Sequence, residues 1–301
     1  MNILPSAGCR ILKNKHLEVE VIIPGTFYTE SRFDWLGMVS RISDTEGNCY
    51  LGQEFLSASQ ASGKTGGIGL SGEFLTMSPW GYAQAKPGEE FLKPGVGFLT
   101  RVGYEDYSFF QDYPVRPFTT EIKSLKDGIE FTQKSCRLKE SVFNLFKSIE
   151  LEGDKLIISS ELENCGGDYL SGDEYCHNFL SFLGHGIVPG LEFNYQADSE
   201  LLWENCDRNL VDLVQGDFSF KRVPEKEFFC SSRFQKPFSE ASWSVRDRFS
   251  GLGVSCLENF PVAKMAIWGT AKVFSPEAFH EFTIEPGMSL FWQRVYRFAN
   301  Y

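Results

Sequence analysis

One histidine and one glutamate have the types and surroundings that proton-transfer chemistry needs. His177 lies in Tyr175–Phe179, within an aromatic and nearly uncharged stretch that continues to residue 191. Histidine is the side chain that exchanges a proton most readily near neutral pH. In this setting His177 is either a hydrogen-bonded core residue or a group held in a pocket for use. The residues alone leave both interpretations open.

Glu277 is the carboxylate with the most specific surroundings. It follows the apolar run Lys264–Trp268 and lies between aromatic residues. Desolvation in such a place raises the pKa of a carboxyl group toward that of a useful general base. A structural explanation is equally open, because a glutamate in the first turn of a short helix is stabilised by the helix dipole.

The composition predicts a globular protein and excludes several classes of function. Of the 301 residues, 42% are hydrophobic and 15% are aromatic, enough for a sizeable core. The 29 Lys and Arg residues against 40 Asp and Glu residues give a net charge of −11, so we expect no nucleic-acid partner. Neither a long uncharged apolar run nor an N-terminal export signal is found. We therefore expect no membrane contact and a cytoplasmic location.

Eight cysteines are scattered along the chain without a C-x-x-C pair or a Cys/His cluster. The sequence therefore predicts no structural metal site. Because the chain is large enough to fold without covalent cross-links and no export signal is found, we expect all eight thiols to be reduced. Most of them then serve as small buried hydrophobic residues.

The elements that must position these side chains are predicted to be antiparallel strands. His16–Ile23 and Lys155–Glu163 alternate in polarity and end at turn residues. Near the C-terminus, Glu281–Ile284 and Met288–Phe298 flank Glu285–Gly287, where Pro followed by Gly suits a type II turn. We expect these last two segments to form a hairpin.

Helical signals are short. Lys86–Phe91 and Ser275–Glu281 are the best candidates, and neither continues into a long amphipathic pattern. Runs of strands without alternating helices argue against a doubly wound sheet. No repeat or linker-like stretch divides the chain, so we predict a single all-β domain over residues 1–301.

Several short segments occur in an order that is typical of one superfamily. They are Arg32–Val39, Phe91–Leu99, Tyr175–Phe179, Ala266–Trp268, Ser275–Glu277, Pro286-Gly287 and Tyr296–Phe298. Together they resemble the aldose 1-epimerase (galactose mutarotase-like) superfamily, especially its divergent bacterial members, over about residues 16–298. The resemblance implies a large antiparallel β-supersandwich with few short helices.

The same resemblance implies an activity. Mutarotases interconvert the α and β anomers of a free sugar by general acid–base catalysis, without a metal, nucleotide or other cofactor. By analogy, Glu277 would be the base and His177 the acid, acting from opposite sides of a monosaccharide or sugar derivative. Each contributes roughly 10²–10⁴-fold when properly placed. Glu281 is the alternative base.

Contacts to the sugar can be assigned by the same analogy. Arg32 and Asp34 either meet sugar hydroxyls or form an ion pair with each other, and Glu73 is expected to face the sugar pocket as well. Common mutarotases have a second histidine where this chain has Val96, so Lys93 and Arg101 are the nearby cations that could substitute for it.

Aromatic platforms and a sugar-binding aspartate complete the expected site. Trp268 is the main candidate platform, since it lies beside a matching segment. Two further tryptophans and three aspartates remain open for these roles: Trp35, Trp80, Asp207, Asp212 and Asp217.

Two other functions stay open. The missing second histidine also suits a non-catalytic carbohydrate-binding or sensory protein that keeps the cleft. Related sandwich domains occur in polysaccharide lyases and hydrolases, although these usually act on exported polymers. We expect a monomer or a homodimer.

Overall fold

The computed structural model describes residues 8–54, 66–196, 202–214, 217–238 and 241–300. In these ranges the chain forms 22 strands and no helix. These ranges therefore contain no helix that could cross a membrane. The expected all-β, antiparallel fold is confirmed, and the expected few short helices are absent from the described residues.

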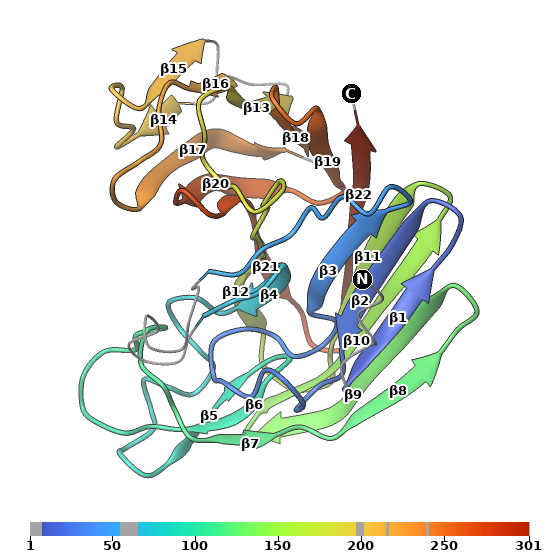
Figure 1. Cartoon of the computed structure of the whole chain (residues 1–301). Helices are drawn as coiled ribbons and strands as arrows, with labels where there is room; N and C mark the ends of the chain where they lie inside the picture. The colour runs from blue at the N-terminus through green and yellow to red at the C-terminus, as the bar shows by residue number, and fades with distance from the viewer. Residues whose placement is uncertain (1–7, 55–65, 197–201, 215–216, 239–240, 301) are drawn as a thin grey trace.

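The first large sheet has nine strands, which are labelled in Figure 1. In spatial order they are β1 (Cys9–Lys13), β2 (Leu17–Ile22), β3 (Val39–Asp44), β4 (Leu70–Phe74), β12 (Leu170–Asn178), β21 (Phe274–Ile284), β20 (Val262–Gly269), β17 (Phe228–Phe238) and β14 (Leu202–Glu204). Neighbouring strands pair antiparallel throughout.

The second large sheet has ten strands. They are β15 (Val211–Val214), β16 (Asp217–Phe220), β13 (Leu191–Gln196), β18 (Ala241–Asp247), β19 (Leu252–Glu258), β22 (Ser289–Asn300), β11 (Lys155–Asn164), β10 (Ser141–Glu152), β9 (Gly128–Leu138) and β8 (Thr120–Ser124). A small third sheet contains β5 (Glu90–Lys93), β6 (Gly97–Thr100) and β7 (Val115–Pro117).

Alternating side chains explain why these segments are strands. In β2, Leu17, Val19 and Val21 are at most 3% exposed, while Glu18 and Glu20 lie on the other, partly exposed face. This period of two lets one face of a sheet bury apolar area while the other meets solvent. The strands expected in His16–Ile23 and Lys155–Glu163 are confirmed as β2 and β11.

The two large sheets pack face to face around a shared core. Phe74 of β4 meets Trp292 of β22 with ring centroids 6.0 Å apart, and Phe193 of β13 meets Phe274 of β21 at 6.1 Å. One hydrophobic cluster contains all four rings. The sheets therefore form a sandwich, and the extent of a single domain over residues 1–301 stays a prediction.

The predicted C-terminal turn is present, but the two strands that flank it do not pair as the predicted hairpin. Met288 N–H donates to the carbonyl of Glu285 at 3.0 Å, and Gly287 has a φ of 76°, as a type II turn requires. The flanking strands β21 and β22 nevertheless pair with different neighbours in different sheets. The turn carries the chain from one layer of the sandwich to the other.

Both predicted short helices are also wrong. Lys86 accepts a turn hydrogen bond from Glu89 at 2.8 Å, and β5 begins at Glu90. Ser275–Glu281 lies within β21, which has a strand partner on each side. Cross-strand pairing on both edges outweighs the local helix-start signal of Ser, Pro and Glu.

The expectation that every cysteine is reduced is wrong for two of them. Cys206 and Cys230 form a disulfide with their Cα atoms 5.0 Å apart. Pairing of β14 with β17 brings these two parts of the chain together, at a separation typical of disulfides. The other six cysteines form no disulfide.

Candidate active site

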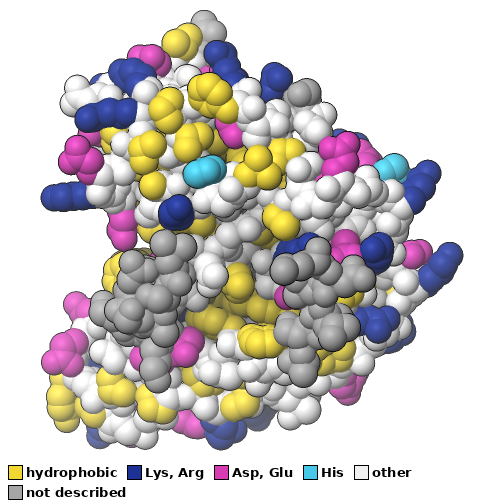
Figure 2. Space-filling model, in the orientation of Figure 1, with side chains coloured by type: hydrophobic (Ala, Val, Ile, Leu, Met, Phe, Trp, Pro, Cys, Tyr) yellow, Lys and Arg dark blue, Asp and Glu magenta, His cyan; other side chains and the backbone are white. Residues whose placement is uncertain are grey.

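A cavity of about 1150 Å³ lies on the face of the nine-stranded sheet that points away from the ten-stranded sheet. Successive side chains of a strand point to opposite faces. On β12, Tyr175 and His177 therefore line the cavity, whereas Glu174 points to the core and binds Arg294 of β22. Figure 2 shows the surface of the molecule hollowed between the part around β20 and the part around β5.

Strand register brings the two candidate catalytic residues together. β12 pairs with β21 so that Glu174 lies opposite His280. The same register, continued by three residues, places His177 opposite Glu277. On the next strand, Ala266 of β20 lies opposite Glu277 and completes a row across the cavity floor.

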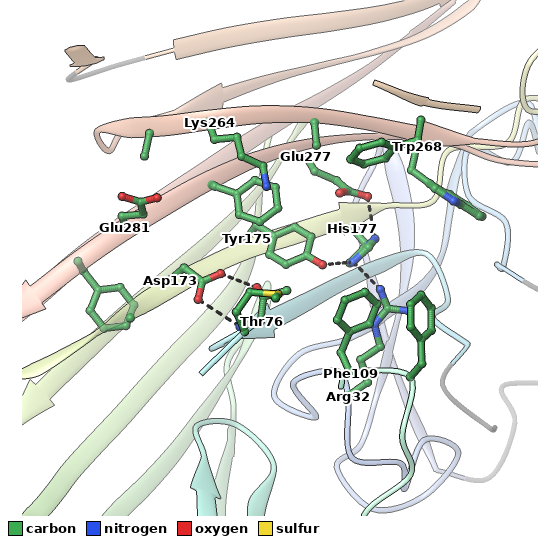
Figure 3. A pocket seen from close by; sticks show the side chains of 18 of the residues that line it. Arg32, Thr76, Phe109, Asp173, Tyr175, His177, Lys264, Trp268, Glu277 and Glu281 are labelled. Carbon is green, nitrogen blue, oxygen red and sulfur yellow. Dashed lines mark hydrogen bonds and ion pairs between the residues drawn. The ribbon is translucent and has the colours of Figure 1, made fainter. Parts of the chain in front are cut away.

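His177 and Glu277 are in direct contact (Figure 3). Nδ1 of His177 lies 2.8 Å from Oε1 of Glu277, as a charge contact outside good hydrogen-bond alignment. Ser275 also donates its hydroxyl to Oε1, at 3.0 Å. The other oxygen of Glu277, Oε2, has no hydrogen-bond partner among the described residues, and the side chain lines the cavity. The expectation that the two groups flank a sugar from opposite sides is therefore wrong.

Tyr175 contacts His177 at the ring nitrogen opposite Glu277. Its hydroxyl donates to Oε2 of Glu73 at 2.8 Å and lies 2.5 Å from Nε2 of His177. Because a hydroxyl carries only one proton, the Tyr175 oxygen can accept a hydrogen bond from a protonated Nε2. The guanidinium of Arg32, which has donors only, lies 3.2 Å from the same nitrogen and opposes a proton there.

The electrostatics favour the protonated form of His177. Burial lowers the pKa of His177, and the Glu277 and Glu73 carboxylates raise it by more, so that the net shift is upward. Burial, together with the charge of Glu73, raises the pKa of Tyr175 well above its ordinary value. Tyr175 thus keeps its proton, and the protonated form of His177 is favoured beside Glu277.

Arg32 lines the cavity next to His177. Its guanidinium donates to Glu73 at 3.1 Å and to Glu54 at 3.4 Å, and it approaches Nε2 of His177 at 3.2 Å. The ring of Phe109 lies 4.7 Å from the guanidinium carbon. The alternative of an Arg32–Asp34 ion pair is wrong, because Arg32 pairs with Glu54 and Glu73 instead.

Glu73 and Lys93 lie behind the cavity and are not among its described lining residues. Both are fully buried, with Lys93 Nζ 3.3 Å from Glu73. Burial raises the pKa of Glu73, and Arg32 and Lys93 lower it by more, leaving it well below its usual range. The expected direct contact of these two residues with a sugar is therefore wrong: Glu73 binds Arg32 and Tyr175, and Lys93 binds Glu73.

Asp34 and Arg101 are also structural. Asp34 is 1% exposed and pairs with Lys147 at 2.5 Å. Arg101 donates to five backbone carbonyls, those of Tyr82, Ala85, Gly103, Tyr104 and Glu105. Neither residue lines the cavity, so the prediction that Asp34 and Arg101 contact the sugar is wrong.

Of the three tryptophans considered, Trp268 alone lines the cavity in the described chain. It lies on β20, two residues beyond Ala266 and therefore on the same face. Trp35 instead donates to the carbonyl of Glu30, and Trp80 donates to that of Ser171.

Asp173 is a cavity residue that the sequence reasoning missed. It lies four residues before His177 on β12 and hence on the same face. Burial raises its pKa, with hydrogen bonds from Thr76 opposing the shift. None of Asp207, Asp212 and Asp217 lines the cavity. The even spacing from His177 is the signal that could have identified Asp173.

The alternative base Glu281 also lines the cavity. It lies four residues beyond Glu277, which corresponds to ~13 Å along the strand. Its side chain is exposed, so it lacks the contact with His177. In the part of the chain that the structure describes, no group of three or more His, Cys, Asp and Glu side chains is arranged to hold a metal ion.

No protein-family model matches the sequence, and no curated protein matches it significantly. Solved structures do match its fold. A galactose mutarotase-like protein from Clostridium acetobutylicum has a TM-score of 0.62 at 14% identity, covering 100% of this chain and 98% of that chain. A galactose mutarotase related enzyme from Lactobacillus acidophilus has a TM-score of 0.59 at 11% identity, covering 97% of both chains.

An aldose epimerase homologue from C. elegans has a TM-score of 0.56 at 11% identity, covering 98% of this chain and 99% of that chain. At these identities the likeness concerns the fold. The chain has the antiparallel β-sandwich fold of galactose mutarotase-like proteins over nearly its whole length.

Proposed function

We propose that this protein with a galactose mutarotase-like fold is a mutarotase that interconverts the α and β anomers of a free sugar. The observation that carries the proposal is the 2.8 Å contact between His177 Nδ1 and Glu277 Oε1 in the cavity. One side chain can supply a proton there, and the other has an oxygen free to take one.

The adjacency of the two groups suits this reaction. In a cyclic sugar the anomeric hydroxyl and the ring oxygen are both bonded to C1. An acid and a base that serve them must therefore act on one edge of the ring. His177 and Glu277 side by side meet that requirement.

The proton transfers balance within this pair. Glu277 takes the proton of the anomeric hydroxyl, and the imidazolium of His177 gives a proton to the ring oxygen. The C1–O bond of the ring breaks as the C1 carbonyl forms. After rotation about C1–C2, the reverse transfers close the ring as the other anomer. No oxidant, reductant or covalent intermediate is needed.

The surrounding side chains support sugar binding. Arg32 can donate to hydroxyl groups, and the rings of Phe109 and Trp268 offer apolar surfaces for the C–H faces of a sugar. Burial of His177 and Glu277, at 5% and 4% exposure, strengthens charge interactions at the site.

Polarimetry on freshly dissolved aldoses tests the proposal. The wild-type protein should accelerate anomerisation of at least one sugar, and His177→Ala and Glu277→Gln should each lose roughly 10²–10⁴-fold of the rate. Glu285→Gln, in the exposed turn after β21, is the matched control and should keep it. Absence of acceleration for every sugar would remove the enzymatic claim.

A non-catalytic carbohydrate-binding protein is the second candidate. It is favoured by Val96, which stands where common mutarotases have a second histidine and is 1% exposed here. A thermal shift with a sugar that the protein does not anomerise would support this alternative.

A further inference from the structure

The cavity is longer than the acid–base pair requires. It encloses about 1150 Å³, above the roughly 300–1,000 Å³ of pockets that hold drug-sized ligands. Cross-strand rows of β12 and β21 form its floor. His177 with Glu277 is one row, and Asp173 with Glu281 is another, two rows further along (Figure 3).

A single sugar ring cannot touch both rows. Asp173 and Glu281 lie four residues from His177 and Glu277, or ~13 Å along the strands. A pyranose ring with its hydroxyl groups spans about four bond lengths, or ~6 Å. A ring whose anomeric carbon lies beside Glu277 therefore ends over the row between the two.

We propose that the cavity holds two sugar rings and that the preferred substrate is a neutral reducing oligosaccharide, with a disaccharide as its smallest form. The inference rests on the proposed function, which puts the anomeric carbon of the reducing ring beside Glu277. The second ring lies over the row formed by Asp173 and Glu281.

The intermediate row separates the two ring positions. Tyr175 and Phe279 stack there with ring centroids 4.1 Å apart. Nζ of Lys264, from the adjacent strand β20, lies 4.0 Å from the centroid of Phe279. Lys264 has no ion-pair partner among the described residues, so its ammonium group is available to donate to hydroxyl groups of either ring.

The outer row offers acceptors for hydroxyl groups. The backbone N–H of Thr76 donates to Oδ1 of Asp173 at 3.1 Å, and its hydroxyl donates to Oδ2. A carboxylate has about four lone-pair sites, so Asp173 keeps unused ones. Ser171 and Thr283, whose hydroxyl oxygens are 3.0 Å apart, extend the polar lining beyond it.

The two ends of the cavity differ in burial. His177 and Glu277 are 5% and 4% exposed, whereas Ser171, Glu281 and Thr283 are exposed. A ligand therefore has its reducing ring at the closed end and its further rings at the open end. This polarity matches a reaction that needs a free anomeric hydroxyl.

The charge of the lining favours a neutral ligand. Its described residues include five carboxylates, those of Glu54, Asp173, Glu227, Glu277 and Glu281, against three cations, Arg32, Lys264 and the imidazolium of His177. Arg32 is already bound to carboxylates. A phosphate or carboxylate on the sugar would meet net repulsion, while neutral hydroxyl groups can donate to the carboxylates.

Progress curves of anomerisation for matched sugars test the inference. D-glucose is compared with maltose, cellobiose and lactose, all of which have glucose as the reducing ring, and glucose 6-phosphate serves as the anionic probe. We expect kcat/KM to be at least tenfold higher for one disaccharide than for its monosaccharide, and lowest for the phosphate. Monosaccharides turned over as well as all the disaccharides, or a preference for the phosphate, would overturn the inference while leaving the proposed function intact.

Variants locate the second ring. Lys264→Ala and Asp173→Asn should each lower the ratio of disaccharide to monosaccharide kcat/KM by about fivefold or more. Lys272→Ala, an exposed lysine in the turn between β20 and β21, is the matched control and should leave the ratio unchanged. Ratios that stay at the wild-type value in both cavity variants would contradict this placement.

Calorimetric titration separates failure of the inference from failure of the proposed function, since it needs no turnover. If no sugar is anomerised, a Kd for maltose, cellobiose or lactose at least tenfold below that of its monosaccharide still supports two ring positions. Equal affinities, or no binding of any sugar, would overturn them.

Discussion

The hydroxyl of Tyr175 lies 2.5 Å from Nε2 of His177, two residues further along the same face of β12. It joins the histidine to the buried carboxylate of Glu73. Glu277, His177, Tyr175 and Glu73 thus form a continuous chain of polar contacts, with the cavity at one end and the ion pairs of Glu73 at the other.

Tyr175→Phe tests whether this hydroxyl positions the histidine. Loss of the acceptor on Nε2 disfavours the imidazolium, because hydrogen bonding to a charged form stabilises it. We expect kcat to fall by roughly tenfold with little change in KM, and the alkaline limb of activity to move down by about one pH unit. An unchanged pH profile would assign Tyr175 a packing role only.

The pH dependence of the rate follows from the raised pKa of His177. The acid form that donates to the ring oxygen is present below that pKa and is lost as pH rises through it. We therefore expect kcat/KM, measured from about pH 5 to 9, to fall on the alkaline side with a midpoint above ~6.5, the ordinary value for histidine. His177→Gln should remove this limb.

Glu73→Gln should lower stability. The substitution leaves the buried cations Arg32 and Lys93 without their main partner, a change that costs about 3–5 kcal/mol of the free energy of unfolding. Because folding lowers the pKa of Glu73, its contribution is present above the pKa of the unfolded chain, ~4.3, and is lost as pH falls below it. Urea denaturation at pH 7 and pH 3.5 should show the wild-type advantage shrinking in acid.

Arg101→Lys distinguishes a structural cation from a sugar contact. The guanidinium serves five carbonyls, and an ammonium group cannot reach them all, so the free energy of unfolding should fall by about 2 kcal/mol. KM should stay unchanged. The control is Arg116→Lys at an exposed pair with Glu90, which should cost less than ~1 kcal/mol.

Counting thiol groups before and after reduction tests the disulfide directly. Of eight cysteines, six are outside a disulfide, so titration of the denatured protein should find six thiols without reductant and eight after reduction. Cys206→Ser should cost about 3 kcal/mol, because the bond closes a loop with a sequence separation of 24. Cys165→Ser, at an exposed free thiol, should cost little. Eight thiols before reduction would contradict the bond.

Local sequence patterns predicted the parts of the fold that depend on near neighbours. Lys155–Glu163 alternates in polarity and is a strand, and Pro286-Gly287 forms the expected turn. Strand partners depend on distant residues, so the strands that flank this turn were wrongly paired. Ser275–Glu281 has a helix-like beginning and is a strand because β12 and β20 bind it on both sides.

The candidate site shows the same division. His177 and Glu277 were identified from their surroundings and from the family resemblance, but their contact depends on the β12–β21 register. Arg101 was misassigned because its partners are backbone carbonyls, which leave no trace in residue types. Asp173 could have been found, since its even spacing from His177 places it on the same face of one strand.

Exchange NMR of a sugar that the wild-type protein anomerises tests the central claim most directly, because it measures the rate at which α and β anomers interconvert at equilibrium. The account predicts strong exchange with wild-type protein and a loss of at least 10²-fold with Glu277→Gln, while the variant still binds the sugar. Equal exchange in wild type and Glu277→Gln would contradict the assignment of this carboxylate as the base.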